Sequence, residues 1–130
     1  MHGTLGSNQT EQGSRPRRGC QGFRLRPLRQ RGIDARNFEG RLAERPRGET
    51  TVVYHSVVLL YLEAAARRRF AAVVEAAGAA ATPSDPLAWL AYEPEATEGG
   101  FALHLTCWPG GERRRLALAQ PHGRWVEWLG

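Results

Sequence analysis

"TTVVYHSVVLLYLEAAARRRFAAVVEAAGAAATPSDPLAWLAYEP", residues 50–94, is the stretch that decides the fold of this chain. Residues 50–56 are rich in β-branched and aromatic side chains, which predicts a strand buried on both faces, as in a parallel sheet. Residues 61–78 carry apolar side chains at helical spacing and predict a helix that stops near Gly78. After the break at "TPSD", residues 86–94 alternate like a second strand. The order strand, helix, strand predicts an α/β fold.

The sequence that follows predicts an antiparallel hairpin. Residues 101–108, "FALHLTCW", alternate apolar and polar side chains, "WPGGE" is typical of a turn, and residues 113–120 supply the returning strand. In α/β sheets, ligands bind beyond the carboxyl ends of the parallel strands. That rule points to His55 and Ser56, which close the first predicted strand.

The basic character of the chain belongs to its N-terminal part. All 18 basic residues are arginine, and residues 1–50 hold 11 of them against 5 acids, whereas residues 51–130 hold 7 against 8. Residues 1–49 mix Arg, Gly and Pro without a regular apolar period, so we expect them to be mostly irregular. One exception is residues 34–44, where Phe38 and Leu42 are four apart and predict one or two helical turns.

This basic segment raises the hypothesis of an arginine-driven nucleic-acid-binding module, because clustered guanidinium groups bind phosphate. Only Phe23 and Phe38 interleave with its arginines, and it forms no known recognition module. We therefore expect any nucleic-acid binding to be weak, nonspecific and sensitive to salt.

The two cysteines, Cys20 and Cys107, have neither a CxxC nor a Cys/His spacing. They predict two free thiols in a reducing compartment and no zinc site. The longest apolar run is soon interrupted by Glu63 and Arg67, which indicates no membrane span. The N-terminus lacks the apolar region of a secretory signal, so a cytoplasmic location is expected.

Residues 50–129 resemble a known family. "TTVVYHSVVLLYL", "AAGAAATPSDPLAWLAYEP" and "LHLTCWPGGERRRLALAQPHGRWVEWL", in this order, resemble the C-terminal part of an uncharacterised bacterial family, the domain of unknown function DUF2332. The strand order is similar to the last part of a class I S-adenosylmethionine-dependent methyltransferase, whose sheet ends in a reversed hairpin. The resemblance therefore implies that residues 50–130 are the C-terminal portion of a Rossmann-like, methyltransferase-type sheet.

Two departures limit what the resemblance implies. The part of a methyltransferase that binds the cofactor lies in earlier strands, with a glycine-rich turn and an acid, and this chain has no candidate for either. The resemblance also implies that members of the family are much longer. We therefore expect a truncated member without independent activity, in which S-adenosylmethionine binding belongs only to a full-length relative, and in which residues 1–33 are unrelated to the fold. A sheet without its neighbours also exposes the edge of its first strand, so self-association is expected.

The candidate site residues are His55, Ser56 and Tyr61. His55 at the mouth of the sheet could act as a general base, and Tyr61 could reach back over the same mouth from the start of the helix. The structural alternative is a histidine that closes the strand through hydrogen bonds to the backbone, a capping serine and a packing tyrosine. Because His55 and Ser56 are neighbours on a strand, they point to opposite faces, which argues against a serine hydrolase.

The remaining histidines and tryptophans predict structural roles. His104 lies in a predicted strand opposite its apolar face, and His122 lies in a predicted turn. Their spacing does not match a metal site. We expect the four tryptophans to fill the core, and the acids at 85, 93, 95 and 98 to be solvated loop charges.

Overall fold

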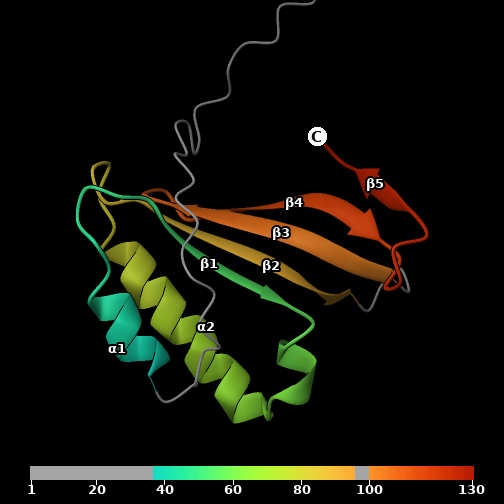
Figure 1. The fold of residues 1–130 in the computed structure, drawn as a ribbon, viewed down its shortest axis with the longest axis horizontal. Helices are drawn as coiled ribbons and strands as arrows, with labels where there is room; N and C mark the ends of the chain where they lie inside the picture. Colours follow the sequence, from blue (N-terminus) through green and yellow to red (C-terminus); the bar gives the residue numbers. More distant parts are fainter. Residues whose placement is uncertain (1–36, 96–99) are drawn as a thin grey trace, which may run out of the picture.

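The structure is a computed structural model that describes residues 37–95 and 100–130. These residues form a mixed α/β fold with two α-helices and one five-stranded sheet (Figure 1). The α/β class expected from the sequence is thereby confirmed. In chain order the elements are α1 (Phe38–Ala43), β1 (Thr51–Ser56), the 3-10 helix η1 (Leu59–Tyr61), α2 (Ala64–Ala79), β2 (Leu87–Glu95), β3 (Gly100–Trp108), β4 (Glu112–Ala119) and β5 (Val126–Trp128).

The five strands lie in the order of the sequence, β1-β2-β3-β4-β5. β1 and β2 are parallel, and all later neighbours are antiparallel. A parallel pair needs a crossover connection, and α2 supplies it here. The predicted hairpin is confirmed as β3 and β4, whose turn uses positive φ angles of 124° at Gly110 and 71° at Gly111. β5 was not predicted, because its three residues are too few to show a period.

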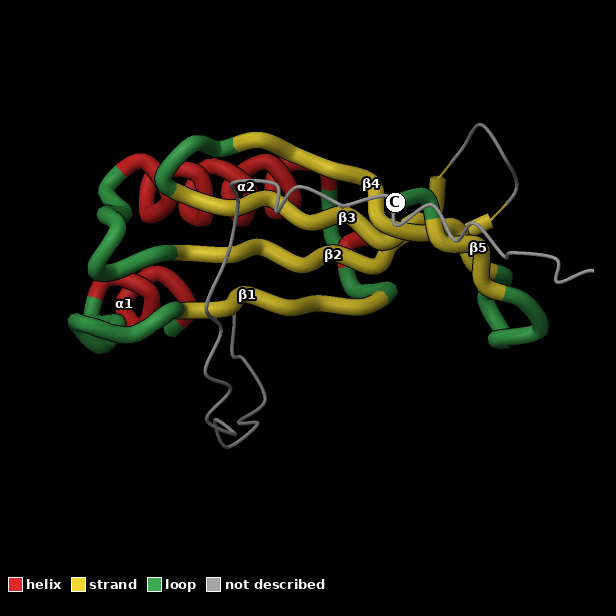
Figure 2. The backbone as a smooth tube through the Cα atoms, turned by 90° about the horizontal axis from the view of Figure 1, so that it is seen from above, coloured by secondary structure: helices red, strands yellow, loops and turns green. Residues whose placement is uncertain are grey.

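Both helices lie on the same face of the sheet (Figures 1 and 2). The main core forms between this face and the helices, with Phe70, Trp89 and Trp108 packed around a fully apolar centre. Burial of these apolar side chains is the main favourable term for folding. The buried residues at the centre are Phe38, Leu42, Val53, Val74 and Leu87.

The helix α2 differs at both ends from the helix predicted over residues 61–78. It begins at Ala64, because η1 takes up the preceding residues and Leu62 is extended. It ends at Ala79, so Gly78 lies inside its last turn and does not stop it. The structure gives Gly78 another role: a Cβ built there would lie 2.4 Å from two ring atoms of Trp108. Glycine allows the tryptophan ring of β3 to pack directly against the helix.

The prediction that β1 is buried on both faces is wrong. Val53 and His55 are buried beneath the helices, whereas Val52 and Tyr54 are 37% and 55% exposed. The reason is that the described helices α1 and α2 both lie on one face of the sheet, which a run of β-branched and aromatic residues does not reveal. Among the described residues β1 pairs with β2 alone, so β1 is an edge strand of this sheet.

The short helix predicted within residues 34–44 is present as α1. Its Phe38 and Leu42 are both buried, and Phe38 stacks on Phe70 of α2 with ring centroids 4.8 Å apart. The prediction that these two residues share one face is confirmed. The packed part of the chain therefore starts before residue 50. Residues 1–36, which include most of the arginine-rich segment, lie outside the described part.

The sheet face opposite the helices, which we call the open face, carries Phe101, Leu103 and Leu105 of β3. Trp89 packs in the core beneath the helices, and its pairing partner Thr106 on β3 lies on the same side of the sheet. Side chains alternate along a strand, so Leu103, Leu105 and Cys107 point to the other face. No described helix covers this face (Figure 2). Its larger apolar side chains on the first three strands are Val52, Tyr54, Leu90, Tyr92, Phe101, Leu103 and Leu105.

Candidate functional site at the carboxyl ends of β1 and β2

The parallel strands β1 and β2 end at the same edge of the sheet, because Ser56 is aligned with Tyr92. The chain turns sharply as it leaves β1. Val57 has a φ of 55°, an unusual conformation for a β-branched residue, and its N–H donates to the Tyr92 carbonyl at 2.8 Å. Backbone strain of this kind clusters at functional sites, so this edge is the first place to look for one.

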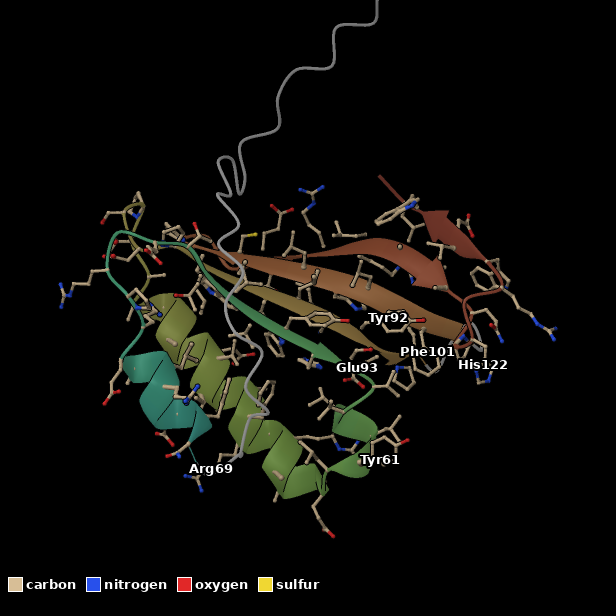
Figure 3. All side chains as sticks on the ribbon, viewed as in Figure 1. Tyr61, Arg69, Tyr92, Glu93, Phe101 and His122 are labelled. Carbon is tan, nitrogen blue, oxygen red and sulfur yellow. The ribbon has the colours of Figure 1, made fainter. Side chains whose placement is uncertain are left out.

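Glu93 is the centre of a hydrogen-bond network at this edge. Its Oε1 lies 2.7 Å from Nδ1 of His55 and also accepts the backbone N–H groups of Val58 and Leu59, at 2.9 and 3.2 Å. The Glu93 side chain is only 15% exposed. One carboxylate oxygen thus connects β1, β2 and the start of η1. Figure 3 labels Glu93 at this edge of the sheet. The expectation that Glu93 is a solvated loop charge is wrong, because Glu93 lies within strand β2 and its side chain is largely buried.

The hydrogen bonds of His55 fix its tautomer. Nε1–H of Trp89 lies 2.9 Å from Nε2 of His55, and an indole nitrogen can only donate. Nε2 therefore accepts, and Nδ1 carries the proton that it donates to Glu93. Both ring nitrogens of this buried histidine are occupied. In this arrangement His55 orients Glu93 and has no free lone pair with which to take a proton from another group.

Ser56 and Tyr61 lie near this network without joining it. Ser56 is half-buried at the last position of β1, on the opposite face from His55. Tyr61 is 79% exposed and projects outward from η1 (Figure 3). With Val58 and Leu60, which are 46% and 42% exposed, it forms an apolar tip beside the network. The structure thus brings the three predicted residues to one edge, but it does not place their side chains in contact.

The second carboxylate oxygen of Glu93, Oε2, is buried and has no hydrogen-bond partner among the residues that the structure describes. Buried polar atoms are nearly always hydrogen-bonded, because an unsatisfied one costs roughly 1 to 3 kcal/mol. Oε2 can only accept while the carboxylate is ionised, so the chemistry that fits it is an N–H or O–H donor.

A groove of about 730 Å³ lies elsewhere, between α1 and α2. Its lining includes the aliphatic Ala72 and Ala76 together with Arg47 and Asp85, but none of the residues at the strand ends. Asp85 accepts the backbone N–H of Gly48, and this hydrogen bond lowers the pKa of the carboxyl group below its ordinary value. Asp85 therefore connects the loop before β1 to the loop before β2, and it is a loop charge as expected from the sequence.

His104 and His122 do not take part in the network. His122 lies in the exposed turn before β5, where its backbone N–H donates to Oε1 of Gln120 at 2.8 Å. His104 is half-buried on β3, on the helix-facing side of the sheet. Burial lowers the pKa of His104 below its ordinary value, Arg113 and Arg115 lower it further, and Glu95 opposes them.

The lowered pKa of His104 predicts a loss of stability in acid. Between the folded-state pKa and the unfolded value of about 6.5, the unfolded chain binds more protons, so the free energy of unfolding falls as the pH falls through this window. His104→Gln is expected to flatten the dependence of Tm on pH between about pH 7 and pH 5. Thermal melts of the two proteins at several pH values measure the slopes. Equal slopes would show that another group causes the acid effect.

Two of the four tryptophans fill the core and two do not. Trp89 and Trp108 pack against the buried cluster, whereas Trp125 and Trp128 are 47% and 70% exposed. The expectation that all four fill the core is thus wrong for the last two, since they lie around the exposed edge strand β5. Within residues 37–95 and 100–130, no cluster of three or more His, Cys, Asp or Glu could hold a metal ion. None of the helices in the described part of the chain is long and apolar enough to cross a membrane.

Comparison with known proteins shows the family. The model of an uncharacterised protein conserved in bacteria, DUF2332, matches residues 20–128. The chain belongs to DUF2332. The match takes in residues 20–49 as well as the stretch on which the resemblance rests. No curated protein and no solved structure matches the chain.

The role of Glu93 at the centre of the hydrogen-bond network was missed in the sequence of this DUF2332 chain, although a signal for it was present. The rule that points to the carboxyl end of β1 applies equally to the end of the parallel strand β2, where Glu93 stands. Its place in "AYEPE", before a proline and beside a second acid, made a loop the simpler interpretation. The proline at 94 is tolerated within β2 and does not end the strand.

Proposed function

We propose that the carboxyl ends of β1 and β2 form the substrate side of a Rossmann-like, methyltransferase-type domain in DUF2332 proteins. The β1-α2-β2 unit and the antiparallel hairpin that follows support this relation. The observation that carries the proposal is the buried, unpartnered Oε2 of Glu93 at the edge where α/β sheets bind ligands. Its occupant is a small molecule with an N–H or O–H donor.

The residues at this edge have different roles in the proposal. His55 is a positioning residue, because it holds Glu93 through Nδ1 and is itself held by Trp89. Tyr61 lines the approach, and Ser56 stands at the same strand end on the other face of the sheet. The exposed tip of η1 gives Tyr61 an apolar surface over which a substrate passes. The ligand reaches Oε2 when the strained turn at Val57 shifts. The chain itself has no independent activity in this proposal.

Binding of a donor to Glu93 is tested by thermal melts with a panel of small amines, amidines and polyols. A ligand that binds only the folded state raises Tm with concentration. We expect at least one amine or amidine to do so, and Glu93→Gln to remove the shift. S-adenosylmethionine is expected to leave Tm unchanged, because the chain has no glycine-rich turn for it.

Glu95→Gln is the matched control. Glu95 lies on the same strand, two residues further on, and forms an exposed ion pair with Arg115 at 3.1 Å. Such a pair contributes about 0 to 1 kcal/mol, so the variant keeps both the fold and the ligand response. If Glu93→Gln responds to the same donors as the unchanged protein, Oε2 is not the binding atom. If no donor raises Tm, the network serves the fold alone.

A further inference from the structure

Four polar side chains meet on the helix-facing side of strands β3 and β4. Thr106 of β3 is paired with Arg113 of β4, and His104 is paired with Arg115. Directly opposite residues of an antiparallel pair point to the same face, with Cβ atoms about 4.5 to 5.5 Å apart. Thr106 lies on the side of the core tryptophan Trp89, so all four side chains share that side. We call these four residues the β3–β4 cluster.

Three members of the β3–β4 cluster carry hydrogen-bond donors without a partner. Within residues 37–95 and 100–130, no hydrogen bond or ion pair joins the Thr106 hydroxyl, the His104 ring or the Arg113 guanidinium to another residue. Thr106 is only 8% exposed and His104 is half-buried, so water reaches both groups poorly. Because buried polar groups are nearly always hydrogen-bonded, a ligand that accepts hydrogen bonds fits this set.

The electrostatics of the cluster favour an anion. Burial is the first cause of the lowered pKa of His104, Arg113 lowers this pKa further, Glu95 raises it, and Arg115 lowers it again. The two arginines are thus close enough to disfavour a positive charge on the histidine. Glu95, the acid at this place, forms an ion pair with Arg115 at 3.1 Å. The charge of Arg113 therefore stays available to a negatively charged ligand.

We propose that Arg113, Thr106 and His104 bind a phosphate group. Arg113 is exposed, so neither α1 nor α2 closes the cluster to a ligand from solution. A guanidinium group presents several N–H donors in a fixed plane, which suits a phosphate, and charge-assisted hydrogen bonds of this kind are the stronger ones. The hydroxyl of Thr106 and the ring N–H of His104 add neutral donors beside it.

The neighbouring residues of both strands point to the open face and take no part in the cluster. Cys107 is paired with Glu112 on that face and is disulfide-bonded, so the expectation of a free thiol is wrong for this residue. Arg114 is paired with Leu105 on the same face. Arg114 therefore has the same charge as Arg113 one residue away but on the other side of the sheet, which makes it the matched control.

Phosphate binding is tested by thermal melts of the full chain with increasing inorganic phosphate, with the ionic strength held constant by sodium chloride. A ligand that binds only the folded state raises Tm with its concentration. We expect Arg113→Gln to weaken this binding at least about tenfold, because a charged hydrogen-bond donor is lost, and Arg114→Gln to leave it unchanged. No rise in Tm overturns the proposal. An equal rise in the two variants also overturns it, because phosphate stabilises proteins generally by exclusion from their surface.

The place of binding is tested by nuclear magnetic resonance of the histidine rings during the same titration. His122 lies in the exposed turn before β5, outside the cluster, and serves as the internal control. We expect phosphate to shift the ring signals of His104 and not those of His122, and Arg113→Gln to abolish the shift. Unmoved His104 signals beside a rise in Tm would place the anion elsewhere and overturn the proposal. Circular dichroism checks that Arg113→Gln keeps the fold.

A parallel titration with glycerol phosphate distinguishes free phosphate from a phosphate ester as the source of the group. Severalfold tighter binding of the ester identifies an ester ligand, and equal binding identifies the phosphate group alone. Failure of both compounds to shift His104 overturns the proposal. None of these measurements involves Glu93, so their outcome is independent of the proposed ligand site at the ends of β1 and β2.

Discussion

Leu87→Ala is expected to lower the free energy of unfolding by about 2 to 5 kcal/mol. Leu87 is 1% exposed at the start of β2 and belongs to the cluster that joins the sheet to both helices. Its removal costs the transfer free energy of the lost methyl groups and leaves a cavity that cannot collapse fully, because a strand on either side holds the backbone of β2 in register. Urea unfolding followed by circular dichroism measures the change.

Leu60→Ala is the control for this substitution. Leu60 is 42% exposed on η1 and lies outside the buried cluster. The same atoms are removed, but the position is open to solvent, so the expected loss is only a fraction of that at Leu87. An equal loss at the two positions would contradict the core described for this fold.

Gly78→Ala is expected to lower the free energy of unfolding by about 1 to 3 kcal/mol, although alanine is the better helix former. The new Cβ would meet the fused bond of the Trp108 indole ring at 2.4 Å, and Gly78 is itself buried. The ring cannot swing away as the tip of a flexible side chain does. Helix and sheet must move apart instead, which disturbs the packing of the cluster around Val74.

The helix α1 offers a matched control. Gly40 has no atom within 4 Å of a built Cβ, so Gly40→Ala is expected to stabilise the protein by about 0.5 to 1 kcal/mol. A second variant tests the cause of the clash, because combining Gly78→Ala with Trp108→Leu removes the ring that the Cβ meets. We expect the cost of the glycine substitution to shrink in the presence of Trp108→Leu. An unchanged cost would place the strain elsewhere than at the tryptophan.

The candidate site shows how far sequence reasoning reached. The rule for α/β sheets led to His55 and Ser56 at the end of β1, and the structure does place a polar network at this edge. The partner that organises the network, Glu93, is 38 residues away in the sequence. Only the parallel register of β1 and β2, which no local pattern encodes, brings its carboxylate under the histidine.

The sequence by itself determined most of the elements and their order. Apolar spacing over a few residues predicts α1, α2 and the strands β1 to β4, and the two glycines of "WPGGE" predict the hairpin turn, because these features depend on neighbours along the chain. The tertiary structure alone decided which sheet face is covered, why Gly78 is a glycine, and where Cys107 points. Each of these depends on contacts between residues far apart in the sequence, so the physical reason is the register and layering of the sheet.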